Sequence, residues 1–108
     1  MQQFRGGMSE AMRQAARMQR KIEQLKAEIK DREHTAGAAG DKVKVTATCE
    51  GKLSRVEIDP EFLAAEGLEM VCDTVTAAAN AALALADKHV EEEMAKITGA
   101  VKLPNLGG

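Results

Sequence analysis

The sequence predicts an α+β domain: a long N-terminal helix, a small antiparallel sheet of two or three strands and a long C-terminal helix, all within a single domain of residues 1–108. Two observations predict this order, helical periodicity toward both ends of the chain and a strictly alternating apolar pattern between them. The 108 residues include two Phe and no Trp or Tyr. The core must therefore be aliphatic and small, and because a long helix cannot bury its own apolar side, we expect self-association.

The first predicted helix runs from Met8 to Glu33, after a flexible tail of residues 1–7. No Gly or Pro interrupts it, and Ser9 is placed to cap its start. It should end near His34, before a stretch that contains two glycines. Its apolar side chains recur at steps of four and three, the spacing of a narrow helix contact. These residues, called the apolar seam below, are Ala11, Ala15, Met18, Ile22, Leu25 and Ile29.

The opposite face of this helix carries a row of cations. Taking about 100° per residue, Arg13, Arg17 and Arg20 fall on this face, with Lys21 beside them. The row, called the cationic row below, is roughly 10 Å long, comparable with the width of a DNA groove. Like charges four residues apart cost about a few tenths of a kcal/mol per pair, so helix stability does not favour this arrangement. A solvated charged face is the simpler interpretation, and an anion-binding face, extended by Arg5 from the tail, is the alternative.

Charge is unevenly distributed along the chain. The formal net charge is −2, which taken alone argues against a nucleic-acid partner. Residues 1–30, however, hold seven basic and three acidic side chains, whereas residues 61–108 hold three basic and eight acidic ones. Because a partner responds to the local field, the basic N-terminal part can still bind an anion.

Other kinds of site find little support in the sequence. Cys49 and Cys72 lie outside any CxxC or Cys/His motif, so we predict no disulfide and no metal site, and interpret both as small buried residues in a reducing cytoplasm. His34 and His89 have no partners at catalytic spacing, so we predict no catalytic residue, no cofactor and no small-molecule substrate. No signal peptide is apparent, and no apolar run reaches the roughly 18 residues that a membrane span needs.

The middle of the chain predicts a hairpin. Lys42–Cys49 alternates between apolar and polar residues, with Thr46 among those expected to face solvent. After a tight turn, Lys52–Ile58 is the return strand, in which Leu53 is out of phase with the other apolar residues, so we expect a bulge there. Arg32–Ala36 is a candidate third strand.

The C-terminal half predicts two helices. Asp59 and Pro60 form a helix start, with an acid at the N-cap and Pro at the first helical position, and Gly67 ends this short helix. A long helix follows over Leu68–Thr98, and residues 100–108 form a second flexible tail. Because Ala77–Ala86 is apolar nearly all round, it should be buried on more than one side and lie at the centre of a subunit interface. The expected interface residues are Val75, Ala78, Ala79, Ala82, Leu83 and Ala86.

These features, taken in order, carry a resemblance that covers nearly the whole chain. A Met/Gln-rich first helix comes first, then a Val-Lys-Val-Thr strand, a glycine turn, an Arg-Val-Glu-Ile-Asp-Pro segment that opens a helix, and Leu-Pro in the tail. The quoted residues are Met8, Met12, Gln14, Ala15, Met18, Gln19, Val43–Thr46, Gly51, Arg55–Pro60 and Leu103–Pro104. The sequence resembles the YbaB/EbfC family of nucleoid-associated proteins, and Val-Glu-Ile-Asp-Pro before a helix is the most specific part.

The resemblance implies an intertwined homodimer whose first helices project like the arms of tweezers and which binds double-stranded DNA in the bacterial cytoplasm, at the nucleoid, without enzymatic activity. It favours phosphate binding by the cationic row, with broad sequence preference because nothing in the spacing requires base contacts. The expected DNA-binding residues are Arg5, Arg13, Arg17, Arg20 and Lys21. The alternative is a helical chaperone-like or protein-interaction module that does not bind DNA.

Overall fold

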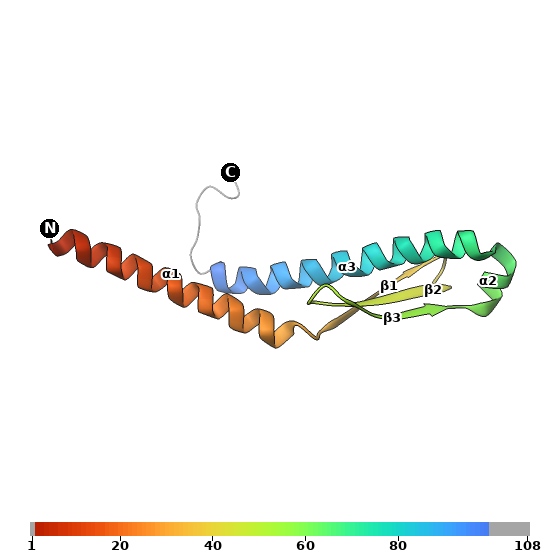
Figure 1. Ribbon diagram of the computed structural model, residues 1–108, viewed down its shortest axis with the longest axis horizontal. Helices are drawn as coiled ribbons and strands as arrows, with labels where there is room; N and C mark the ends of the chain where they lie inside the picture. The colour runs from red at the N-terminus through yellow and green to blue at the C-terminus, as the bar shows by residue number, and fades with distance from the viewer. Residues whose placement is uncertain (1, 100–108) are drawn as a thin grey trace.

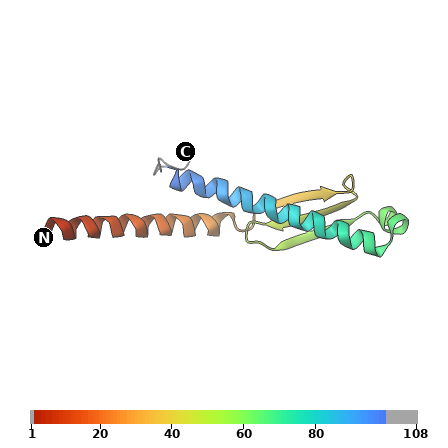
Figure 2. The same ribbon diagram turned by 90° about the horizontal axis from the view of Figure 1, so that it is seen from above.

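The computed structural model describes the backbone of residues 2–99 and the side chains of residues 8–99, so the predicted tail of residues 100–108 lies outside the described residues. Three helices and three strands follow in the predicted order: α1 (Gln2–Ile29), β1 (Glu33–Ala38), β2 (Val43–Thr48), β3 (Leu53–Ile58), α2 (Pro60–Glu66) and α3 (Leu68–Thr98). The α+β prediction is confirmed. The molecule measures 75 × 31 × 18 Å, because the N-terminal part of α1 extends well beyond the end of α3 (Figures 1 and 2).

The three strands form one antiparallel sheet in the order β1-β2-β3, which confirms the candidate third strand. The register between β2 and β3 shifts between Thr46 and Ala47, where Ala47 pairs with Leu53, and this irregularity is the predicted bulge. The expectation that Thr46 faces solvent is wrong. Its side chain is buried on the outer face of the sheet, where its Oγ1 lies 2.7 Å from Oγ1 of Thr35 on β1.

The core lies between α3 and the first two strands (Figure 1). Val43, Val45 and Ala47 point from β2 toward α3 and are fully buried. On α3 they meet three alanines spaced four residues apart, which we call the alanine row: Ala78, Ala82 and Ala86. A methyl side chain lets the helix backbone approach the sheet closely. The small alanines and the valines of β2 together therefore fill the space between α3 and the sheet.

The alanine row corrects part of the expected subunit interface. The three alanines are at most 1% exposed, because the chain's own sheet covers them, and they have no surface left for a second subunit. Val75, Ala79 and Leu83, also spaced four residues apart, lie beside the row and are only half-buried against the same core. Ala77 and Ala81 are exposed, so this segment of α3 is buried on one side in the single chain.

The third strand has an apolar side that the described chain covers only in part. Val56 pairs with Val45 and Ile58 with Val43, so their side chains lie on the helix side of the sheet. α3 packs mainly on β1 and β2, however, and contacts β3 only slightly. Leu53, Val56 and Ile58 consequently remain 48%, 45% and 39% exposed. We call these three residues the β3 stripe.

Both ends of α1 differ from the prediction. The helix begins at Gln2, not after residue 7, and it ends at Ile29, not near His34. Its early end has a tertiary cause, because the turn after β2 binds the backbone that leaves the helix. The N–H of Cys49 donates to the Arg32 carbonyl (3.0 Å), and the N–H of Glu50 donates to the Lys30 carbonyl (3.1 Å). These bonds hold residues 30–32 in a turn that leads into β1.

The start of α2 and the bounds of α3 agree with the sequence. The Asp59 carboxylate accepts a hydrogen bond from the Glu61 N–H (2.9 Å), and Pro60 follows it at the first helical position. This hydrogen bond, assisted by Lys42, lowers the pKa of Asp59. Gly67 separates α2 from α3 with φ +86°, a backbone angle that favours glycine.

By length and composition, α3 is the one helix among the described residues apolar enough to cross a membrane. The sequence alone predicts no such segment, in part because Asn80 interrupts the alanines. Core helices pass the same test, and one side of α3, the alanine row, packs on the sheet.

The alanine row predicts a sharp difference between two neighbouring positions on α3. Replacing buried Ala82 by Leu should overpack the contact with β2 and lower the free energy of unfolding by about 1–3 kcal/mol. Replacing exposed Ala84 by Leu should change it by less than about 0.5 kcal/mol. Urea denaturation followed by circular dichroism measures both. Equal effects of the two substitutions would mean that α3 packs on the sheet through a different face.

Candidate nucleic-acid interface

The cationic row lies on the part of α1 that stands clear of the sheet (Figure 1). The side chains of Arg13 and Arg17 are 62% and 50% exposed, and Arg20 and Lys21 are exposed as well. The structure therefore brings these four predicted residues together on one open helix surface. Arg5 lies within the backbone range of α1, but its side chain falls outside the described residues.

One carboxylate lies within this row. Nη2 of Arg13 donates to Oε1 of Glu10 over 2.8 Å, and Nη2 of Arg17 lies 3.9 Å from Oε2 of the same residue. Within residues 8–99, Arg20 and Lys21 have no ion pair. A single acid shared by two exposed guanidinium groups leaves the row with net positive charge, and such exposed pairs are weak enough to exchange partners.

The apolar seam on the other side of α1 is covered only toward its C-terminal end. Ile29 is buried, and Met18, Ile22 and Leu25 are half-buried, but Ala11 and Ala15 are exposed. Met8 and Met12, at 55% and 70% exposure, extend this uncovered apolar surface. A shallow hollow of about 470 Å³ follows the seam between Ala15 and Lys26. The chain by itself does not bury this half of the helix.

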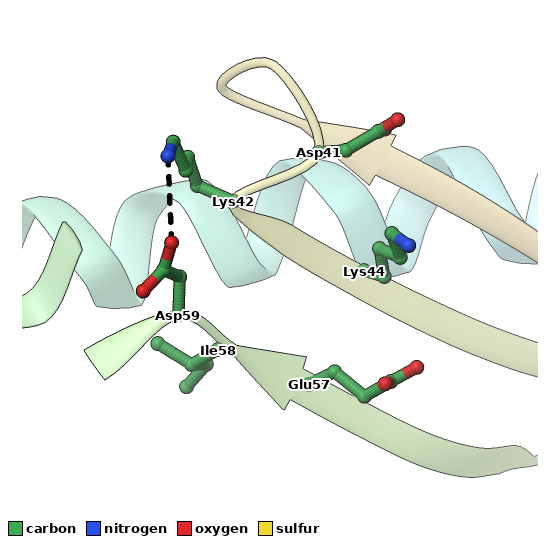
Figure 3. A pocket seen from close by; sticks show the side chains of 6 residues that line it. All are labelled: Asp41, Lys42, Lys44, Glu57, Ile58 and Asp59. Atoms are coloured by element: carbon green, nitrogen blue, oxygen red, sulfur yellow. Dashed lines mark hydrogen bonds and ion pairs between the residues drawn. The ribbon is translucent and has the colours of Figure 1, made fainter. Parts of the chain in front are cut away.

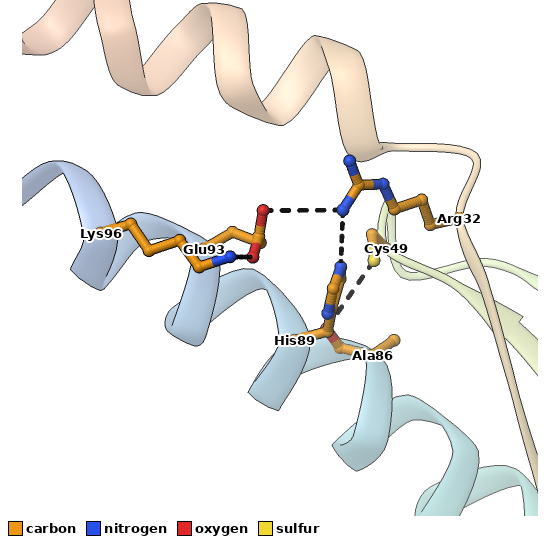
Figure 4. A network of polar contacts seen from close by, with 6 residues as sticks. All are labelled: Arg32, Cys49, Ala86, His89, Glu93 and Lys96. Atoms are coloured by element: carbon orange, nitrogen blue, oxygen red, sulfur yellow. Dashed lines mark hydrogen bonds and ion pairs between the residues drawn. The ribbon is translucent and has the colours of Figure 1, made fainter.

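A polar junction holds the base of α1 against α3 (Figure 4). Arg32, just after the helix, places Nη1 3.0 Å from Nε2 of His89, to which it donates, and 3.6 Å from Oε1 of Glu93. Lys96 Nζ lies 2.6 Å from Oε2 of Glu93. The hydrogen bond from Lys96 lowers the pKa of the Glu93 carboxyl, and the nearby charge of Arg32 acts in the same direction. Sequence spacing suggests Glu92 as the partner of Lys96 instead, because spacing alone cannot distinguish i,i+3 from i,i+4 pairs.

Next to this junction the structure brings together three residues that share no motif in the sequence. The rings of His34 on β1 and His89 on α3 have centroids 4.8 Å apart, and Cys49 in the turn after β2 completes the group. His34 was expected near the end of the first helix, whereas it lies in a strand and is half-buried. Burial raises the pKa of the Cys49 thiol. Cys72, in contrast, is exposed and not buried as expected.

A second hollow lies where β2 begins and β3 ends (Figure 3), at the end of the sheet that is far from α1 (Figure 1). It measures about 210 Å³ and is lined by both signs of charge. Lys42 Nζ lies 3.4 Å from Oδ2 of Asp59, and Lys44 is directly opposite Glu57 in the strand register. Because its charges are matched within the chain, this hollow has no excess of positive charge for a phosphate backbone.

The geometry is that of a small α+β domain with an exposed basic helix, and the comparison with known proteins agrees with it. The profile of the YbaB/EbfC DNA-binding family matches residues 4–101. The chain therefore belongs to the YbaB/EbfC DNA-binding family.

Relatives match the chain over nearly its full length. A nucleoid-associated protein of Moorella thermoacetica is 40% identical over 94% of this chain and 97% of its own. A nucleoid-associated protein of Pelotomaculum thermopropionicum is 38% identical over 94% of this chain and 96% of its own. Among solved structures, an uncharacterized protein of Helicobacter pylori is similar with a TM-score of 0.59 and 25% identity, over 82% of this chain and 98% of that one.

The junction at the base of α1 predicts a dependence of stability on pH. The pKa of Glu93 is lower in the folded chain than its ordinary value of 4.5. Its contribution is therefore present above the unfolded-state pKa and is lost as the pH falls through the folded-state pKa. We expect Glu93→Gln to have a lower melting temperature than the wild type at neutral pH, and this difference should shrink as the pH falls below 4.5.

Thermal unfolding followed by circular dichroism, from neutral pH to below 4.5, measures the difference in melting temperature between Glu93→Gln and the wild type. Glu92→Gln is the matched control, because it removes the same charge from the neighbouring position, where the structure records no contact with Arg32 or Lys96. It should follow the wild type at every pH. A difference between Glu93→Gln and wild type that stays constant on acidification would contradict the role of the ionised carboxylate.

Proposed function

We propose that this protein is a homodimeric nucleoid-associated protein that binds double-stranded DNA through the cationic row of α1. The observation that carries the proposal is the placement of Arg13, Arg17, Arg20 and Lys21 on the part of α1 that stands clear of the sheet, where all four are exposed and a single carboxylate, Glu10, pairs with two of them. Membership of a DNA-binding family and the names of its nucleoid-associated relatives support the same partner and a location at the bacterial nucleoid.

The proposed mechanism is neutralisation of backbone phosphates. Guanidinium and ammonium groups that contact phosphates release the counterions condensed on the duplex, which makes binding favourable and strongly dependent on salt. The row is made of long, exposed side chains on a regular helix, so it can follow a phosphate backbone without reading base edges. We therefore expect a broad sequence preference.

A second copy of this chain is the proposed partner of the two uncovered apolar surfaces. The β3 stripe is a row of large apolar side chains on the helix side of the sheet, and the N-terminal half of the apolar seam is equally uncovered. Burying such side chains stabilises an assembly by about 1.5–3 kcal/mol each when burial is complete. Val75, Ala79 and Leu83, which keep part of their surface, remain the proposed contribution of α3 to the contact.

The exposed seam also keeps the second candidate function open, that of a module that binds other proteins. Met8 and Met12 present flexible apolar side chains of the kind used by promiscuous binding surfaces. Such a protein would suppress aggregation of an unfolded client and would be indifferent to DNA. A DNA titration and an aggregation-suppression assay on the same preparation separate the two functions.

The cationic row predicts the salt dependence of DNA binding. Replacing Arg13, Arg17 and Arg20 together by Gln keeps helix propensity while removing three charges per chain. We expect weaker binding to a duplex and a shallower slope of log K against log salt, by about 0.9 for each phosphate that the variant no longer neutralises. Fluorescence anisotropy with a labelled duplex at several salt concentrations measures the slope.

The matched control for this experiment removes three charges elsewhere, with Lys44, Arg55 and Lys88 replaced by Gln, all exposed and none of them on α1. Its slope should stay close to that of the wild type. If the control variant loses as much affinity as the α1 variant, binding reflects total charge, and the cationic row has no special role.

The β3 stripe predicts the oligomeric state. The wild type should have twice the chain mass of 11.6 kDa in solution, and Val56→Glu should shift it toward the mass of a single chain because a carboxylate then has to enter an apolar contact. Arg55→Glu introduces a carboxylate on the opposite face of the same strand and should stay dimeric. Light scattering after size exclusion measures each mass. A monomeric wild type would contradict the proposed self-association.

A further inference from the structure

His34, Cys49 and His89 come from three different elements and converge beneath α1. One nitrogen of each histidine and the sulfur of Cys49 all lie within 4.8 Å of one another. The strand pairing explains part of this, because His34 lies opposite Ala47 and Cys49 comes two residues later. α3 adds His89 one turn beyond Ala86, whose carbonyl oxygen lies 3.9 Å from Sγ of Cys49 (Figure 4).

The histidine on β1 has an unused nitrogen. Nε2 of His34 is buried and has no hydrogen-bond partner, the one such side-chain atom found in the described part of the chain. Buried polar atoms are nearly always paired, so an unpaired imidazole nitrogen needs an explanation. It lies in a group whose other members are a thiol and a second imidazole, which are metal ligands by type.

From this convergence we propose that His34, Cys49 and His89 form a binding site for one divalent transition metal ion of the zinc class. Zinc bonds of 2.0–2.3 Å place tetrahedral ligand atoms about 3.5 Å apart. The three donor atoms, no more than 4.8 Å apart, therefore need to approach by about 1.3 Å or less, a distance that side-chain rotations supply. On binding, the Cys49 thiol releases its proton to solvent and the thiolate sulfur becomes the ligand.

The donor set decides which ions fit. Two imidazoles and one thiolate suit zinc, cobalt, nickel or copper, whereas magnesium and calcium prefer oxygen ligands. Three protein ligands leave a fourth position for water or a further group. Arg32 lies beside the site, 3.0 Å from Nε2 of His89, and its charge opposes an ion. Glu93, 3.6 Å from the same guanidinium, offsets the charge of Arg32 in part.

An ion also has a route to the site. Cys49 lines a hollow of about 460 Å³ between α1, the turn after β2 and α3. Its lining combines apolar side chains with charged ones of both signs, Asp87 and Glu50 on one hand and Lys26 and Lys30 on the other, and it is open to solvent. The ion would join β1, the turn and α3 directly under the residues that end α1, since the N–H groups of Cys49 and Glu50 hold that backbone. Metal binding would therefore stiffen the base of the projecting helix.

Cobalt titration of untagged, reduced, metal-free full-length protein tests the site. Binding through Cys49 produces a thiolate-to-cobalt charge-transfer band in the near ultraviolet together with visible d–d bands, saturating at one ion per chain and reversed by zinc. Cys49→Ser should lose the charge-transfer band. Cys72→Ser is the matched control, because that thiol is exposed and outside the group, and it should keep the band. His89→Gln should weaken cobalt binding by at least about tenfold.

Thermal unfolding with and without saturating zinc gives a second readout that does not depend on the spectrum. Zinc should raise the melting temperature of the wild type and of Cys72→Ser, and should do so much less in Cys49→Ser and His89→Gln. Circular dichroism shows whether each variant is folded before metal is added. The proposal is overturned if wild type shows no charge-transfer band at saturating cobalt, or if the band survives in Cys49→Ser and disappears in Cys72→Ser.

Discussion

The contact between the alanine row of α3 and the buried side of β2 is the constraint on which the other features depend. Ala78, Ala82 and Ala86 have no side chain beyond a methyl group, so α3 lies close to the valines of β2 and covers β1 and β2. A narrow helix set close to one side of a three-stranded sheet cannot also cover the third strand. The same contact that completes the core therefore leaves the β3 stripe exposed.

The chain is long for its mass because its first helix has little to pack on. Only the C-terminal end of the apolar seam is covered, and the molecule reaches 75 Å in length. Two apolar surfaces, the β3 stripe and the N-terminal half of the apolar seam, thus remain exposed. The core of the chain is built largely of alanine and valine. A second copy that covers them would add the core volume that a domain of this size lacks, and it would bring two cationic rows into one particle. The proposed self-association and the proposed DNA binding would in this sense be linked through the same helix.

Charged side chains connect the base of α1 to α3. Arg32, His89, Glu93 and Lys96 connect the end of the helix to α3 through exposed or half-exposed contacts. Contacts of this kind contribute modestly to stability and respond to pH and salt. The group of His34, Cys49 and His89 lies directly beside them, so an ion bound there would act on the direction of the helix more than on the cationic row.

The order of elements, the bulge at Leu53, the cap at Asp59 and the bounds of α3 could all be predicted from sequence, because each follows from periodicity or from the chemistry of neighbouring residues. The surface row of Arg13, Arg17 and Arg20 could be predicted for the same reason, since residues on one helix face are related by local spacing. The end of α1 at Ile29 could not, because hydrogen bonds from a distant turn set it.

Packing partners likewise required the fold. The sequence indicated that Ala78, Ala82 and Ala86 would be buried, but periodicity cannot tell a chain's own sheet from a second subunit. His34, Cys49 and His89 lie 15 or more residues apart and have no motif spacing, so only the crossing of strand, turn and helix brings them together. Local interactions decide where helices and strands form, whereas the contacts between them depend on which surfaces meet when the chain closes on itself.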